Sequence, residues 1–436
     1  MKSRRVVLRR LAVATFAAGV VATGCVKQEQ SNDGVNPEKP LWVNRPSGSM
    51  HVFARRPLTA ASRTVGEDYE RGRAEIDVAS GRVFLGSADR GLYALRSGDL
   101  STIWRFETLG VVQSEPLYDR ELDYVYFGSH DGALYCVKAS DGGLVYRFNS
   151  GAEVARKPVL FGETLLFANG ADNLFAVDRR NGKLRWTQHR TSALGMEISG
   201  HAGPALDGSR VFMAYSDGHV LAYDARDGSE SWPQPIDLAG EAEAAAGGVA
   251  PRYLDVDTTA VLDDHPTGGR IVYVAGYAGG VFALSAENGA PIWKNERATG
   301  VADLTLWREP AHAPRGGVES GEPMVPERKM LLAASATTGL WALDVVTGKM
   351  LWRVPIPEGG ITAPMAISGA LMLGTTRYGM FLISPRNGKV IDGFDLGSGF
   401  SQTPAVFGNR AYAMSNGGTM LGIEVEPPPV ATAGGR

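Results

Sequence analysis

A short phrase returns along most of this 436-residue chain, and no other sequence feature limits the possible folds as strongly. Each copy runs from an apolar segment that ends in Ala-x-Asp or a similar triplet, through a turn glycine, to a tryptophan. Complete copies end at Trp104, Trp186, Trp232, Trp293 and Trp352. A tandem repeat of this length indicates an array of small structural units, each of which packs against the next.

One repeat has the composition of a small antiparallel sheet. Runs such as 210–215 and 271–275 are rich in β-branched and aromatic residues, which favours strands. Turn glycines such as Gly182 and Gly228 supply the positive φ that a tight hairpin needs. Many repeats open with a small residue and a proline, and proline suits the beginning of a strand because its missing N–H is harmless there.

The repeats predict a closed all-β ring of eight units. Two of the units are degenerate and place Tyr146 and Asp392 where the tryptophan is expected. The last unit, 404–426, stops before a tryptophan strand, so we expect a strand upstream of Arg73 to complete it. Such a ring is an eight-bladed β-propeller of four-stranded blades, an architecture that protects nearly all strand edges. The alternative is an open β-solenoid or a pair of sandwiches.

Two blades carry insertions, near 240–270 and 303–328, because the spacing between successive aromatic marks is longer there. Long loops on a rigid scaffold are often where binding takes place. They are equally often tolerated surface decoration, and the sequence does not decide between these readings.

The first residues predict export and lipid anchoring. Residues 1–24 combine a basic start with an apolar run too short to span a bilayer, which is typical of a signal peptide. The small residues before Cys25 resemble a bacterial lipobox, in which the cysteine is acylated and becomes the new N-terminus. Residues 25–40 are polar and suit a flexible tether. Val26 is not the aspartate that marks inner-membrane retention, which favours the periplasmic face of the outer membrane.

The sequence leaves the export route and the lipidation of the N-terminal segment undecided. Arg4 and Arg5 resemble a twin-arginine export signal, but general secretory signals also contain adjacent arginines. An ordinary secretory signal with a chance cysteine is the alternative to lipidation. The propeller is expected over 41–426, and the proline-rich tail 427–436 is expected to be disordered.

Composition excludes several classes of function. With 44 basic and 47 acidic residues, the chain offers no basic surface for nucleic acid. Two cysteines are too few for a disulfide framework, and Cys136 lies in an apolar strand where a buried thiol is expected. The seven histidines show no metal-ligand spacing. We therefore expect no catalytic, cofactor-binding or metal-binding residues.

The repeat resembles the propeller of pyrroloquinoline-quinone (PQQ) dehydrogenases, whose blades end in a similar Thr-Gly-x-x-x-Trp phrase. The segment 346–352 is the nearest copy. In that phrase the tryptophan packs between blades and is part of the scaffold. Those enzymes also use an adjacent pair of cysteines, which Cys25 and Cys136 cannot form. A quinone-dependent periplasmic oxidoreductase, or a non-catalytic relative of one, is therefore the alternative function.

The string Asp-Val-Asp-Thr-Thr at 255–259 is more specific, and it resembles a segment of the BamB family of outer-membrane assembly lipoproteins. The resemblance implies a non-enzymatic scaffold that docks on the periplasmic domains of the barrel-inserting subunit and helps proteins insert into the outer membrane. It also implies that Asp255 and Asp257 belong to the docking surface. Carboxylates at i and i+2 of an extended segment point the same way, so both could meet one basic patch. The alternative is that either aspartate caps a turn.

A second docking loop of that family is matched in part. Met196 and Ile198 have the expected apolar character, but Ser199 stands where the family has arginine. The resemblance also implies a protein that is monomeric within a hetero-complex and bound to the membrane through its lipid. A periplasmic interaction propeller with an unrelated partner is the third possible function.

Overall fold

The computed structural model describes most of the chain downstream of residue 46. The described residues are 47–58, 70–191, 201–245, 247–248, 253, 255–265, 268–313, 323–355, 360–395 and 397–427. All of them belong to one compact unit, Glu38–Arg436. Cys25, Met196, Ile198 and nearly all of the expected tail lie outside the described residues. Within the described ranges, no helix has both the length and the apolar content needed to cross a bilayer.

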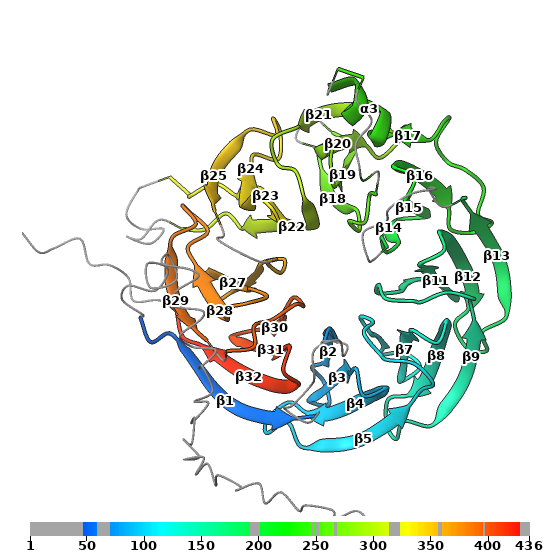
Figure 1. The fold of residues 1–436 in the computed structure, drawn as a ribbon, viewed down its shortest axis with the longest axis vertical. Coiled ribbons are helices and arrows are strands. Elements are labelled where there is room, and N and C mark those ends of the chain that lie inside the picture. Colours follow the sequence, from blue (N-terminus) through cyan, green and yellow to red (C-terminus); the bar gives the residue numbers. More distant parts are fainter. Residues whose placement is uncertain are drawn as a thin grey trace, which may run out of the picture. The chain divides into compact units, whose positions relative to one another are not determined.

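Eight antiparallel four-stranded sheets surround a common axis, which confirms the fold predicted from the repeat (Figure 1). Blade 1 consists of β2 (Ala74–Asp77), β3 (Arg82–Gly86), β4 (Gly91–Arg96) and β5 (Thr102–Glu107), and blade 2 of β6 (Leu117–Asp119), β7 (Tyr124–Ser129), β8 (Ala133–Lys138) and β9 (Leu144–Asn149). Blade 3 consists of β10 (Val159–Phe161), β11 (Thr164–Asn169), β12 (Asn173–Asp178) and β13 (Leu184–His189), and blade 4 of β14 (Ala205–Asp207), β15 (Arg210–Ala214), β16 (His219–Asp224) and β17 (Ile236–Asp237). Blade 5 consists of β18 (Val261–Asp264), β19 (Arg270–Gly276), β20 (Gly280–Ser285) and β21 (Pro291–Asn295), and blade 6 of β22 (Val301–Glu309), β23 (Arg328–Ser335), β24 (Gly339–Leu343) and β25 (Met350–Val354). Blade 7 consists of β26 (Met365–Ile367), β27 (Ala370–Gly374), β28 (Met380–Ile383) and β29 (Val390–Phe394), and blade 8 of β30 (Ala405–Phe407), β31 (Arg410–Met414), β32 (Thr419–Val425) and β1 (Met50–Pro57).

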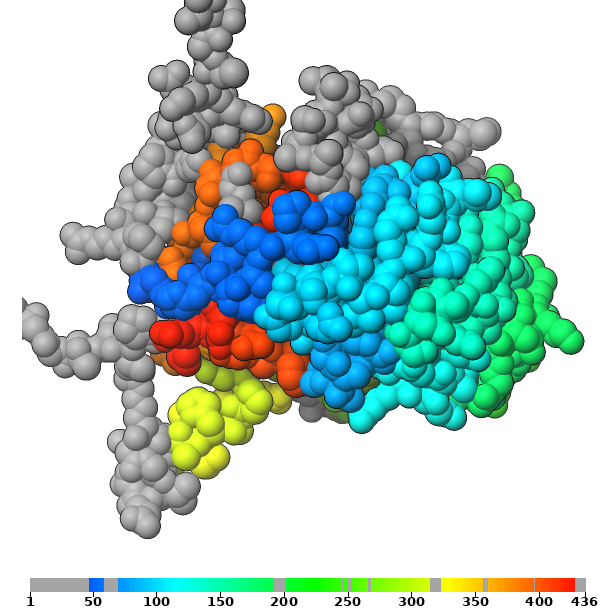
Figure 2. Space-filling view, turned by 90° about the horizontal axis from the view of Figure 1, so that it is seen from below, coloured from blue at the N-terminus to red at the C-terminus, as the bar shows by residue number. Residues whose placement is uncertain are grey.

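The ring closes in the way that the incomplete last repeat predicts. β1, from the beginning of the described chain, pairs antiparallel with β32 near its end, from Met50 opposite Val425 to Pro57 opposite Thr419. Figure 2 shows the blue residues of β1 lying against the red residues of β32. The two ends of the propeller are thus joined by backbone hydrogen bonds, which leaves no open blade at the seam.

The hydrophobic core is divided into eight clusters, one at each junction between neighbouring blades. The cluster between blades 1 and 2, for example, joins Phe84 and Leu92 to Val125 and Phe127, and all four are fully buried. A single twisted sheet cannot bury both of its faces alone, so each blade depends on the next. The ring is therefore stabilised by neighbour contacts rather than by one central core.

The repeated tryptophan links adjacent blades, as expected from the dehydrogenase phrase. Trp104 of blade 1 donates its indole N–H to the carbonyl of Ala139 in blade 2 over 2.9 Å. Its ring covers Gly142, where an added Cβ would lie 2.8 Å from the indole, so only glycine fits this turn, with φ of 75°. The same bond joins the other tryptophans to carbonyls of the following blade: Trp186 to Ala225, Trp232 to Ala286, Trp293 to Val345 and Trp352 to Pro385.

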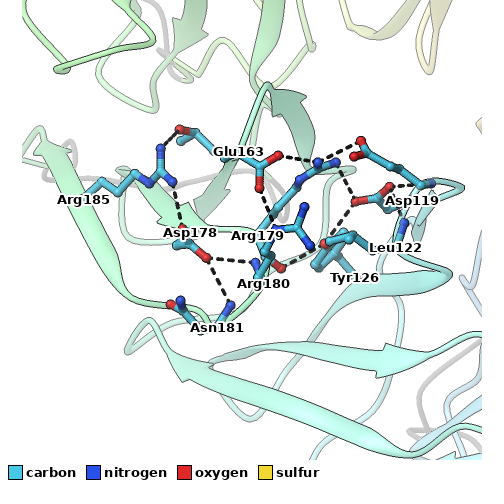
Figure 3. Close-up of polar contacts among 11 residues, drawn as sticks. Asp119, Leu122, Tyr126, Glu163, Asp178, Arg179, Arg180, Asn181 and Arg185 are labelled. Carbon is cyan, nitrogen blue, oxygen red and sulfur yellow. Dashed lines mark hydrogen bonds and ion pairs between the residues drawn. The ribbon is translucent and has the colours of Figure 1, made fainter.

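The junction between blades 2 and 3 lacks the tryptophan and uses other contacts. Tyr146 covers the turn glycine there, while the hydroxyl of Tyr126 donates to the carbonyl of Arg179 over 2.9 Å. The Arg179 side chain, which is buried, reaches back to blade 2 and binds Asp119 at 3.1 Å (Figure 3). It also pairs with Glu163 of its own blade at 2.5 Å. The hydroxyl of Tyr126 therefore takes the place of the indole donor, and the buried Arg179 adds a charge contact between the two blades.

The second degenerate position lies at the junction of blades 7 and 8. Asp392 is buried, and its carboxylate accepts the backbone N–H of Met50 over 3.0 Å. Met50 begins β1, so this hydrogen bond connects blade 7 to the strand that closes the ring. Both degenerate units identified in the sequence are thus complete blades whose junctions are made by different side chains.

The expected insertions take two forms. The first contains the short helix α3 (Leu238–Ala245) ahead of blade 5. The second lengthens the hairpin of β22 and β23, which pair from Val301 opposite Ser335 to Glu309 opposite Arg328. Beyond these strands an isolated bridge joins His312 to Val325. Figure 2 shows this yellow-green hairpin projecting from one face of the ring.

Candidate docking segment and central channel

The segment that resembles the docking string runs between blades 4 and 5, directly before β18. Asp255 is only 2% exposed, whereas the side chain of Asp257 is partly exposed. The carbonyl of Asp255 accepts the backbone N–H of Tyr277 over 3.1 Å, and Val256 is buried between them. The two aspartates therefore do not form the exposed pair that the i, i+2 spacing suggested, because the segment is bound to the blade along one side.

The threonines of the string have structural partners. Thr258 is fully buried, and its hydroxyl accepts the N–H of Ala275 at 3.0 Å and donates to the carbonyl of the same residue at 3.1 Å. Thr259 accepts the N–H of Gly203 over 2.9 Å, which links blade 5 to the start of blade 4. Side-chain hydrogen bonds of this kind fix a segment that has no ladder of its own. Much of the string is thereby explained by folding.

Arg156 holds the same segment from the axis of the ring. This residue of blade 3 donates from Nε to the carbonyl of His201 over 2.7 Å and from Nη2 to the carbonyl of Asp257 over 3.1 Å. One guanidinium thus ties blades 3, 4 and 5 together through their backbones. Asp257 is the residue of the string whose backbone is fixed and whose side chain still reaches the surface.

Charged side chains line the channel along the axis, and the sequence analysis did not identify them. Arg73 of blade 1 pairs with Glu115 of blade 2 at 3.1 Å. Lys157 of blade 3 reaches Glu75 of blade 1 at 2.7 Å. Glu115 and Lys157 each stand directly before the opening proline of a blade. That position recurs once per repeat, so the proline pattern could have indicated which residues face the axis.

Asp303 lies at the beginning of blade 6 and lines the same channel. Its carboxylate accepts the backbone N–H of Leu304 over 2.9 Å. Desolvation in the channel raises the pKa of Asp303, while the positive charges of Arg156 and Arg73 oppose the shift. The carboxylate of Asp303 thus lies near two cations but forms no ion pair with a described residue.

His201 occupies the wall between blades 3 and 4. It is buried, its Nε2 accepts the N–H of Ala155 over 3.1 Å, and its Nδ1 lies 3.0 Å from the carbonyl of Ala202. These partners require a neutral ring with the proton on Nδ1. Burial lowers the pKa of His201 to about 4, and the nearby charge of Arg156 acts in the same direction.

The described residues do not form a recognisable catalytic centre. No group of three His, Cys, Asp or Glu side chains among them could hold a metal ion. Cys136 is fully buried in β8, as expected, and burial raises the pKa of its thiol, so it is a poor nucleophile. With Cys25 and Cys136 the only cysteines, the chain also lacks the adjacent pair that the quinone enzymes use, so its residues do not fit that cofactor.

Comparison with known families gives one extended match. The family model described as outer membrane protein assembly factor BamB covers residues 121–303 and 301–427. The chain is 24% identical over 234 residues to the assembly factor BamB of Legionella pneumophila, which is 53% of each protein. It is 23% identical over 348 residues to tetrathionate hydrolase of Acidithiobacillus ferrooxidans, covering 77% of this chain and 56% of that protein. The alignments thus span little more than half the length of these curated relatives.

Solved structures share the propeller fold. The crystal structure of BamB from Moraxella catarrhalis superposes with a TM-score of 0.65 at 16% identity and covers 86% of this chain and 99% of that one. A quinohemoprotein alcohol dehydrogenase from Pseudomonas putida HK5 gives a TM-score of 0.63 at 12% identity, covering 90% of this chain and 78% of that one. At these identities the likeness concerns the fold alone, and it does not separate assembly factors from enzymes.

Proposed function

Because the chain belongs to the family of the outer membrane protein assembly factor BamB, we propose that it is a non-enzymatic scaffold in the assembly of outer-membrane β-barrel proteins. The family match across residues 121–427 is the observation that carries this proposal. A rigid ring with many surface turns suits such a role, since it can present several contacts to large partners at once.

We propose further that the protein docks on the periplasmic domains of the barrel-inserting subunit. Asp257 is the candidate contact of the 255–259 string, because its backbone is held by Arg156 while the residue is partly exposed. A residue on a fixed backbone loses less conformational entropy when it meets a basic partner. Met196 and Ile198, which lie outside the described residues, remain proposed members of the same surface.

Anchoring through an acylated Cys25 at the periplasmic face of the outer membrane completes the proposal. Several acyl chains on one residue would hold the propeller firmly without a spanning helix. Replacing Cys25 by serine should move the protein from the membrane fraction to the soluble periplasm. A Cys25→Ser protein that stays in the membrane fraction would contradict lipid anchoring at this residue.

Site-specific photocrosslinking in the native membrane tests the docking proposal. A photoreactive amino acid at position 257 should crosslink to the barrel-inserting subunit, identified by mass spectrometry. The matched control carries the same amino acid at Asp141, an exposed turn position of blade 2. Equal crosslinking from both positions, or capture of an unrelated protein from position 257, would contradict docking through this segment.

Single substitutions separate docking from folding. Asp257→Ala should weaken co-purification with the subunit while the propeller stays folded, because the backbone contact with Arg156 is retained. Asp255→Ala removes a buried carboxylate, so we expect it to lower stability instead. If Asp255→Ala leaves stability intact and Asp257→Ala does not, the assignment of the two residues is reversed.

A spectrum discriminates between the scaffold and the quinone enzyme. Protein purified with added pyrroloquinoline quinone and calcium should show no bound chromophore after gel filtration, because the residues that those enzymes use are missing from this sequence. A stoichiometric quinone spectrum would favour the oxidoreductase.

A further inference from the structure

Two opposite charges in the central channel have no ion-pair partner among the described residues. The guanidinium of Arg156 is bound to two backbone carbonyls, which satisfy hydrogen bonds but do not neutralise its charge. The carboxylate of Asp303 accepts the N–H of the next residue, which likewise leaves its charge uncompensated. Both residues line the same cavity, and no ion pair joins them.

Most other charges of the channel are paired, and Arg71, which also lines the cavity without an ion pair among the described residues, is exposed. Arg73 pairs with Glu115, and Lys157 with Glu75. At the mouth, Glu153 lies 3.5 Å from His130. Charges in a confined site interact more strongly than on an open surface, and an uncompensated pair there is costly unless water or a ligand bridges it.

The cavity has room for a small molecule. Its volume is about 210 Å³, and Gln402 and Thr403 also line it. A water molecule occupies about 30 Å³ in the liquid, and pockets for drug-sized ligands begin at about 300 Å³. The space therefore suits a ligand of a few non-hydrogen atoms.

We propose that this cavity binds a small amino carboxylic acid, with its carboxylate on Arg156 and its ammonium group on Asp303. A guanidinium binds a carboxylate through parallel N–H donors, and an ammonium group supplies the charge and the donors that the carboxylate of Asp303 lacks. The ligand takes the place of the missing ion pair and leaves the net charge of the channel unchanged. The site adjoins the docking segment proposed above, because Arg156 also binds the carbonyl of Asp257, but binding of the amino acid does not require a docked partner.

Ligand-detected NMR on the purified protein tests the proposal with glycine, 3-aminopropanoate and 4-aminobutanoate, which separate the two charges by increasing lengths. At least one of the three should bind, and acetate and methylammonium, which carry one charge each, should bind more weakly by about tenfold or more. Absence of binding by all three amino acids would overturn the proposal. Equal binding of acetate would also overturn it, since the cavity would then be an anion site only.

Two matched variants locate the site. Asp303→Asn keeps the acceptor for the neighbouring N–H but removes the charge, and it should weaken the best amino acid by about tenfold or more without affecting acetate. Glu153→Gln changes another carboxylate of the same cavity, one that already faces His130, and should leave the affinity unchanged. If Glu153→Gln weakens binding and Asp303→Asn does not, the ammonium group does not lie on Asp303.

Discussion

His201 should make the stability of the propeller depend on pH. The imidazole is buried between blades 3 and 4, where its Nε2 accepts the N–H of Ala155, which requires a neutral ring, and its Nδ1 donates to the carbonyl of Ala202. Protonation would leave Nε2 with a hydrogen facing the Ala155 N–H. Burial, assisted by the charges of Arg156 and His130, lowers the pKa of His201 from 6.5 to about 4.

The sign and size of the effect follow from the two pKa values. The unfolded chain takes up the His201 proton near pH 6.5, whereas the folded protein resists it until about pH 4. The contribution to stability is therefore complete above pH 6.5 and is lost as the pH falls between those values. At about 1.4 kcal/mol for each pKa unit, the loss amounts to roughly 3 kcal/mol.

Urea unfolding of the wild type and of His201→Gln at pH 7.5 and 4.5 measures this term. The variant should be less stable at pH 7.5, because the junction loses its fitted ring, but it should lose roughly 2–3 kcal/mol less on acidification. Other groups that titrate in the same window cancel in the difference. Equal losses for both proteins would refute the reasoning.

An NMR titration keeps the test valid if His201→Gln does not fold. In the wild-type protein the ring of His201 should stay neutral down to about pH 5, since its folded pKa is about 4. A ring that titrates near pH 6.5 would show that the site admits the charged form.

Three further substitutions test the junctions between blades, each by urea unfolding at neutral pH. Trp104→Phe removes the indole donor from the buried carbonyl of Ala139 and should lower the free energy of unfolding by about 1–3 kcal/mol. Trp293→Phe should lower it less, because the hydroxyl of Tyr273 still donates to the carbonyl of Val345 that Trp293 binds. Equal losses would contradict this reasoning. Tyr146→Phe removes a buried hydroxyl without a partner among the described residues and should leave stability unchanged or raise it by up to about 1 kcal/mol. Asp392→Ala should lower stability by about 1–3 kcal/mol, while Asp392→Asn, which keeps an acceptor, should lose less; the reverse order would show that the charge matters more than the hydrogen bond.

The number of blades and the closure of the ring could be predicted from the sequence because both depend on local, repeated signals. A turn glycine followed by a tryptophan marks five blades, two degenerate copies mark two more, and the unit 404–426 is the eighth, which gives the observed number of blades. The unit 404–426 had too few strands, and its only available completion was a strand from upstream, which is β1. Because an unpaired strand edge is unfavourable, the incomplete unit predicts a pairing between segments more than 360 residues apart.

The docking pair could not be predicted in the same way. Alternation along an extended segment predicts that Asp255 and Asp257 point the same way, but it contains no information on what covers that side. Tyr277, which belongs to the next hairpin of blade 5, binds the backbone of Asp255 and helps to bury it. Burial is decided by tertiary neighbours, so a two-residue spacing alone overestimated the exposed surface.

The departures from the repeat are more informative about function than the repeat itself. Where the tryptophan is missing, other side chains connect the blades, as Tyr126 and Arg179 do at the junction of blades 2 and 3. A changed motif residue there is accompanied by a substitute contact. The channel residues differ in that no substitute contact accompanies their variation. The position before the opening proline carries glutamate in one blade, lysine in another and small neutral residues elsewhere. Nothing in the packing of a blade requires these charges. Arg156, two residues before Pro158, binds backbone carbonyls that precede the next two blades, yet neither its charge nor that of Asp303 is paired among the described residues. A purely structural role therefore does not account for these two charges of the channel.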